Sequence, residues 1–119
     1  MSESVDKRIV SALDSILPVW NVIKEKDNEE VTDSYYAFNY STHGIGYADD
    51  DPTAELAIIQ VHLIAPLNVN LTGLIKQTKR ALREAGFTWP EVVDASDAWG
   101  RHKIFEFQDV EGVDLDGDL

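Results

Sequence analysis

From Thr53 to Ala65 the side chains alternate in polarity with a period of two, which is typical of a β-strand with one fully buried face. One set of alternate side chains is wholly apolar: Ala57, Ile59, Val61, Leu63 and Ala65. The other set places Gln60 and His62 among Leu56, Ile58 and Ile64. This pattern is typical of a sheet that helices cover on one side, while the second side is partly polar or contacts a partner. The chain is therefore expected to fold around such a sheet.

Two other segments have helical periodicity. Apolar residues recur at helical spacing from Val5, and Pro18 disfavours the helical conformation at Leu17, so the first helix is expected to end there. The second helix is expected to begin at a cap provided by Asn68 or Asn70 and to end at Gly86. Its predicted buried stripe consists of Leu71, Leu74, Ile75, Thr78, Leu82 and Ala85.

Shorter apolar segments supply the remaining strands. They are expected at Val19 to Ile23, around Tyr36 to Tyr40, from Val92, and at Lys103 to Phe107. Residues 41–44 have the composition of a turn, after which residues 45–48 either pair back or extend as a loop. The order helix, three strands, helix, two strands predicts an α+β two-layer sandwich, with two helices on one face of a mainly antiparallel sheet.

A length of 119 residues is typical of one domain, which is expected to span residues 1–108. Residues 109–119 contain five acidic residues and no basic one, so a disordered acidic tail is expected. The chain has no cysteine, which excludes disulfides and zinc–thiolate sites. No signal peptide or membrane-length apolar run occurs, so a soluble protein made in the cytoplasm is expected.

The net charge is −12, from 22 acidic and 10 basic residues. Such a charge disfavours nucleic-acid binding, which depends on neutralising phosphates with Lys and Arg. It indicates an acidic surface that favours solubility, a surface that lets DNA pass without holding it, or a mimic of DNA. Four basic residues nevertheless share the second helix: Lys76, Lys79, Arg80 and Arg83. They form either a solvated face or the complement of another subunit's acidic face.

Candidate chemistry is sparse. Asp49, Asp50 and Asp51 are oxygen ligands of the kind that Mg²⁺ or Ca²⁺ prefers, but an acidic turn before Pro52 explains them more simply. The three histidines lie in separate segments without metal-binding spacing, and nucleophile or phosphate-binding motifs are missing from the sequence. The sequence therefore predicts no enzyme, no cofactor and no metal. The candidate interface residues are Lys76, Lys79, Arg80, Arg83, Trp99, Asp49 and Asp50.

Large aromatic side chains are numerous for so short a chain. Most of the group formed by Trp20, Trp89, Trp99, Tyr35 and Tyr36 is expected to fill the core. Trp99, in a turn between Ala98 and Gly100, is the best candidate for an exposed anchor of an interface.

From about Tyr36 to Phe107 the chain resembles a known family. The matching segments are Phe38-Asn39-Tyr40, Tyr47-Ala48-Asp49-Asp50, Gln60-Val61-His62-Leu63, Arg83-Glu84-Ala85-Gly86-Phe87 and Ile104-Phe105-Glu106-Phe107. They resemble the tail-terminator, or tail-completion and head–tail joining, proteins of siphophages and prophages. These segments are structural, and the family provides no catalytic residues to transfer.

The resemblance implies a homo-oligomeric ring, typically a hexamer in the virion, at the head-proximal end of the tail tube; such proteins can be monomeric in isolation until a tube end is present. Such a ring stops tube polymerisation and docks the tube to the head connector or stopper protein, while genomic DNA passes through without tight binding. The expected location is the virion neck, with assembly in the host cytoplasm. A ring needs two different contact patches, which the basic helix and the acidic remainder can supply. The alternatives are another neck component (a stopper or minor head-completion protein), a DNA-mimic inhibitor of a host enzyme, and a metal-dependent enzyme using Asp49 to Asp51.

Overall fold

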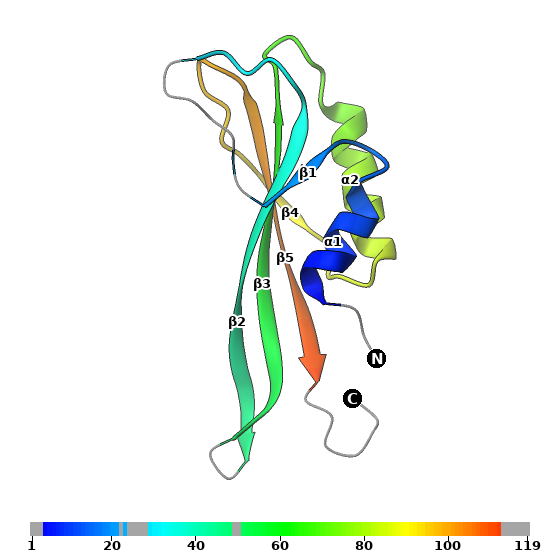
Figure 1. Cartoon of the computed structure of the whole chain (residues 1–119), viewed down its shortest axis with the longest axis vertical. Coiled ribbons are helices and arrows are strands. Elements are labelled where there is room, and N and C mark those ends of the chain that lie inside the picture. The colour runs from blue at the N-terminus through cyan, green and yellow to red at the C-terminus, as the bar shows by residue number, and fades with distance from the viewer. Residues whose placement is uncertain (1–3, 22, 24–28, 49–50, 113–119) are drawn as a thin grey trace.

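The protein is an α+β two-layer sandwich, as its sequence predicts. The computed structural model describes residues 4–21, 23, 29–48 and 51–112. Its elements are α1 (Val5–Leu13), β1 (Val19–Trp20), β2 (Tyr35–Ala48), β3 (Asp51–Ala65), α2 (Thr72–Glu84), β4 (Glu91–Asp94) and β5 (Arg101–Gly112). Both helices lie on the same side of one five-stranded sheet (Figure 1). The strand order is β1-β2-β3-β5-β4, and every neighbouring pair is antiparallel except β1 and β2.

The core lies between the helices and the sheet face that the alternation of β3 predicts. All five apolar residues of that face are buried. Val5, Ile9 and Leu13 of α1 pack against them, together with Leu82 of α2 and the aromatic rings of Tyr36, Phe87 and Phe105. Thr78 and Leu82 of the predicted α2 stripe are fully buried, and Leu71 nearly so. Neither α1 nor α2 lies on the opposite face of the sheet, which is called the open face below (Figure 1).

Of the two local signals at the ends of α2, the one at Gly86 is confirmed, whereas the predicted cap is wrong in position, because the N-cap residue is Leu71. The side-chain oxygen of Asn70 accepts a hydrogen bond from the backbone N–H of Thr72 at 3.0 Å, so Asn70 rather than Asn68 satisfies a free donor of the first turn. Gly86 has a φ of 94°, the left-handed conformation that a glycine after a helix adopts most easily.

The first helix is shorter than predicted. It ends at Leu13, and the backbone N–H groups of Ile16 and Leu17 both bond to the carbonyl of Leu13, at 2.9 and 3.2 Å. This tight turn still lets Ile16 and Leu17 pack against the core while the chain reverses toward β1. The strand after it is also shorter than predicted, since Val19 and Trp20 are the residues of the described segment that pair with β2.

The turn predicted at residues 41–44 is wrong. β2 continues through it, with Ser41 opposite Ile58 and Gly44 opposite Glu55, and residues 45–48 extend the same pairing. Hydrogen bonds from β3 satisfy this backbone, so long-range pairing overrides the local turn composition. β2 and β3 consequently extend past the helix layer, and the molecule measures 52 × 27 × 20 Å (Figure 1).

The predicted boundary at residue 108 is also too early. β5 continues to Gly112, and the buried side chain of Asp109 forms an ion pair with Arg8 of α1. The folded domain therefore extends at least to Gly112, and residues 113–119 of the expected tail lie outside the described residues.

Candidate functional site

The exposed side of α2 carries the basic residues found in the sequence. At about 100° per residue, Lys76, Arg80 and Arg83 lie roughly opposite the buried Thr78. All three side chains are exposed, and none of them makes an ion pair within the part of the chain that the structure describes. Twenty-two acidic residues are present in the sequence, yet this basic stripe remains without an acidic partner among the described residues.

A tryptophan extends this basic stripe. The ammonium of Lys79 lies 5.9 Å from the ring centroid of Trp89, which is within the range of a cation–π contact. Trp89 is 58% exposed. The sequence shows no aromatic residue between the basic residues of α2, but the turn at Gly86 brings Trp89 back to their side. We call Lys76, Lys79, Arg80, Arg83 and Trp89 the basic–Trp surface.

The open face has the opposite character. The pairing of the strands assigns these residues to it: Asn39, Ser41, His43, Ile58, Gln60, His62, Glu91, Val93, His102, Ile104, Glu106 and Gln108. Three apolar side chains on it are widely exposed: Ile58 at 42%, Val93 at 47%, and Trp20, which is opposite Ala37, at 42%. None of the described side chains on this face belongs to a lysine or arginine.

Two carboxylates face each other there. Glu91 of β4 is directly opposite Glu106 of β5, and both are exposed. The side-chain amide of Gln60 donates a hydrogen bond to Glu106 at 3.1 Å, which orients that carboxylate. Like charges in directly opposed positions destabilise a sheet, so this pair makes the open face acidic at a cost in stability.

All three histidines lie on the open face, although they are far apart in the sequence. Nδ1 of His62 is 2.7 Å from Nε2 of His102, and the amide nitrogen of Asn39 is 3.2 Å from Nε2 of His62. Because the nitrogen of an amide can only donate, Nε2 of His62 accepts from Asn39, and Nδ1 of the same neutral ring carries the proton donated to His102. Burial, and secondly the charge of His102, lower the pKa of His62. The sequence marks His62 as a polar strand residue but contains no signal for its pairing with His102.

One end of the open face is covered by the chain itself. Val31 packs against Tyr35, Ala37 and Ile64, and its N–H donates to the carbonyl of Trp99 at 2.8 Å. A side chain at Gly100 would overlap Val31, because a Cβ there would lie 2.5 Å from Cγ2 of that residue. This contact fixes the loop before β5 against the segment before β2.

That loop presents Trp99. Oδ1 of Asp97 accepts the N–H groups of Trp99 and Gly100, at 2.8 and 3.1 Å. Trp99 is 39% exposed, so its predicted exposure is confirmed, whereas its role as an anchor stays a prediction. Asp49 and Asp50, the remaining candidates, lie outside the described residues.

The expectation that most of the large aromatics fill the core is wrong for the tryptophans. Trp20 is 42% exposed, and like Trp89 and Trp99 it lies at the margin of the domain. Tyr35 and Tyr36 are buried as expected. A two-layer domain has a single thin core, and smaller rings already fill it, so the indoles remain at its edges.

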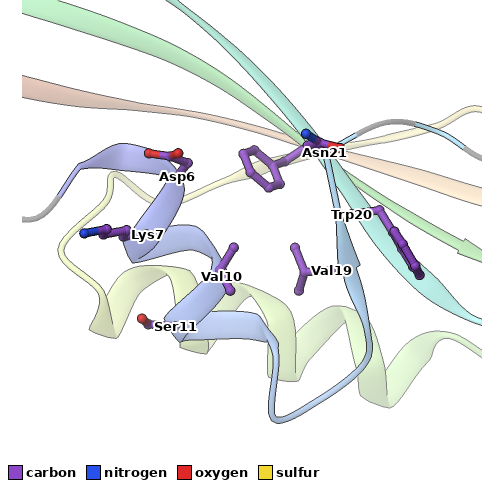
Figure 2. A pocket seen from close by; sticks show the side chains of 8 residues that line it. Asp6, Lys7, Val10, Ser11, Val19, Trp20 and Asn21 are labelled. Atoms are coloured by element: carbon purple, nitrogen blue, oxygen red, sulfur yellow. The ribbon is translucent and has the colours of Figure 1, made fainter.

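A groove separates α1 from β1 (Figure 2). Its volume is about 490 Å³, and Val10, Val19 and Trp20 contribute apolar surface to it. Asp6 and Lys7 are the charged residues on its wall, and both belong to the exposed side of α1. The groove therefore lacks the convergent titratable groups that acid–base catalysis needs.

No group of three or more metal-ligating side chains occurs among the residues that the structure describes. No helix within the same ranges is long and apolar enough to cross a bilayer. Neither a protein-family model nor a curated protein matches the chain.

Proposed function

We propose that this protein is a structural subunit of a siphophage or prophage neck, which forms a ring that caps the tail tube. In this role the ring ends tube polymerisation and docks the tube to the head connector. The working parts are surfaces, and no catalytic step is assigned to the protein.

One observation carries the proposal: the domain presents two exposed surfaces of different chemistry on opposite sides. The basic–Trp surface lies on the outer side of the helix layer, and the acidic open face lies on the far side of the sheet. A ring of identical subunits needs such a pair, because each subunit contacts one neighbour with one patch and the next neighbour with another. The resemblance of residues 36–107 to tail-terminator proteins supports a position of this ring at the head-proximal end of the tail tube.

The charge of the chain fits a neck through which DNA moves. A lumen lined with lysine and arginine would hold phosphates, whereas a net charge of −12 leaves DNA free to pass. Ring contacts also use the few basic residues of α2 and so remove them from the lumen. A different neck role, as a stopper or head-completion protein, would use the same surfaces with other partners.

The DNA-mimic alternative fits less well. A mimic presents carboxylates over an extended face, whereas the basic stripe of α2 interrupts the acidic surface of this domain.

Electron microscopy tests the proposal directly. The tail-tube protein of the same phage is polymerised with and without this protein, and tube length and tube ends are recorded. We expect shorter tubes with a ring at one end. Tubes that keep growing and carry no added density at their ends would contradict the neck role.

A further inference from the structure

We infer that the basic–Trp surface of one copy binds the open face of the next copy. This inference deepens the proposed function, on which it rests for the ring, and it names the two surfaces that meet. In the contact, Lys76, Arg80 and Arg83 lie against the Glu91–Glu106 pair, and Trp89 packs against one of the two exposed apolar residues that flank this pair, Ile58 or Val93.

The first argument is that both surfaces break a rule of local stability. Lys76 and Arg80 are four residues apart on α2, and Arg80 and Arg83 three apart, spacings at which like charges repel across a helix turn. Glu91 and Glu106 are directly opposed in the sheet, where like charges also repel. Each repulsion disappears when the opposite charge is brought against it. Departures from local stability rules of this kind are typical of functional surfaces.

The second argument is the layer structure of the domain. A sheet with exposed apolar residues on its uncovered face reaches a stable packing when a second layer covers that face. Ile58 and Val93 are such residues, on β3 and β4 at either side of β5. A neighbour's α2 placed across them would complete a helix–sheet–helix arrangement, and the exposed ring of Trp89 would supply apolar contact area.

The third argument is size. Lys76 and Arg83 are about 10 Å apart along the axis of α2, at 1.5 Å per residue. The four strands from β2 to β4 span roughly 14 Å, at about 4.8 Å per strand. The basic stripe therefore fits across the open face, and its charges can reach both carboxylates from one helix.

The geometry also fixes how copies are arranged. The two surfaces lie on opposite sides of the domain, so the contact is head-to-tail and leaves a free surface of each kind at the ends (Figure 1). Such contacts repeat from copy to copy, and they form a ring when the rotation between neighbours closes, as the neck role requires, and an open filament otherwise. The contact also explains why the basic stripe is free of acidic partners among the described residues of its own chain.

Charge reversal in two complementary variants tests the inference. The helix variant is Lys76→Glu/Arg80→Glu/Arg83→Glu, and the sheet variant is Glu91→Lys/Glu106→Lys. The control is Asp14→Lys/Glu55→Lys, which changes the net charge as much as the sheet variant does, at exposed positions off the open face. Thermal melting verifies that each variant is folded, and light scattering at low and high salt gives its mass.

We expect either reversal alone to weaken self-association by at least about tenfold, because like charges then face each other. The control should assemble as the wild type does. An equimolar mixture of the helix and sheet variants should assemble again, since every contact in an alternating ring then joins opposite charges. Assembly of the wild type should weaken as salt rises.

Several results would overturn the inference: a wild type that stays monomeric both alone and at tube ends, a helix variant that assembles normally, or a mixture that stays dissociated. Binding of a short duplex DNA to the wild type, lost in the helix variant, would assign the basic–Trp surface to nucleic acid instead.

The same variants separate this inference from the neck role. Variants that still form normal rings on tube ends would refute the contact and leave the neck role standing. A wild type that self-associates through these surfaces but never caps a tube would refute the neck role and leave the contact standing.

Discussion

The guanidinium of Arg8 lies 2.6 Å from a carboxylate oxygen of Asp109, a contact between the first helix and the last strand across 101 residues. A second nitrogen of the same guanidinium donates to the carbonyl of Ala85 at 2.9 Å. The guanidinium carbon also lies 4.2 Å from the ring centroid of Phe87. Arg8 therefore joins α1 to the end of α2 and to β5 at one point.

Replacing Asp109 with asparagine should destabilise the fold. The change leaves a largely buried guanidinium without its charge partner, which costs about 2 kcal/mol in the free energy of unfolding. Urea denaturation measures that free energy. The control Asp33→Asn removes the same charge from an exposed position and should change it by less than about 0.5 kcal/mol. Equal effects of the two changes would show that the Arg8–Asp109 pair contributes nothing.

The two glycines associated with α2 should respond to alanine in opposite directions. At Gly86, φ is 94° and a new Cβ would lie 3.2 Å from a guanidinium nitrogen of Arg8, so Gly86→Ala should cost about 1–2 kcal/mol. At Gly73, inside the helix, nothing lies within 4 Å of the new atom, and Gly73→Ala should stabilise by up to about 1 kcal/mol. Thermal melting of both variants decides this. A stabilised Gly86→Ala protein would contradict the left-handed conformation.

His62 should make stability depend on pH. Its pKa in the folded protein is lowered from 6.5, by burial first and by the charge of His102 second. Below about pH 6.5 the unfolded chain therefore binds a proton more readily than the folded protein does, and acid favours unfolding. This stabilisation is fully present above pH 6.5 and is lost as the pH falls toward the folded pKa, by at most about 1.4 kcal/mol per pH unit for one proton.

Unfolding in urea between pH 5 and 7.5 measures that dependence for the wild type and for His62→Gln. We expect the slope below pH 6.5 to flatten in the variant. An unchanged slope would assign the pH dependence to other groups.

The features that the sequence predicts correctly are local ones. The alternation of β3 identifies its buried side, because period two follows from strand geometry alone. The helical spacing around Thr78 and Leu82 identifies the side of α2 that meets the sheet, and therefore the outer position of Lys76, Arg80 and Arg83. Gly86 identifies the end of that helix for a similar reason, since few other residues adopt its conformation.

The features that it misses depend on which distant segments meet. Residues 41–44 have turn composition, yet they form a strand because β3 is available to pair with them. Arg8 and Asp109, His62 and His102, and Lys79 and Trp89 become neighbours only through register and helix packing. The basic half of the candidate interface is thus visible in the sequence as one helix. Its acidic half, with Glu91 and Glu106 from two strands, emerges only when the sheet is assembled.

A buried hydrogen bond between Tyr36 and Thr78 provides a last prediction about the join between helix and sheet. The two hydroxyl oxygens are 2.7 Å apart, and the Thr78 hydroxyl donates its own hydrogen to the carbonyl of Leu74 at 2.6 Å. Because that hydrogen is committed, the Tyr36 hydroxyl must be the donor of the shared bond.

Tyr36→Phe removes the donor and should cost about 1 kcal/mol in the free energy of unfolding. Thr78→Val removes the acceptor, leaves the Tyr36 donor buried without a partner, and should cost more, about 1–3 kcal/mol. The double variant removes both polar groups, so its cost should be smaller than the sum of the single costs by at least about 0.5 kcal/mol. Urea denaturation of the three variants completes the cycle, and additive costs would show that the two hydroxyls do not interact.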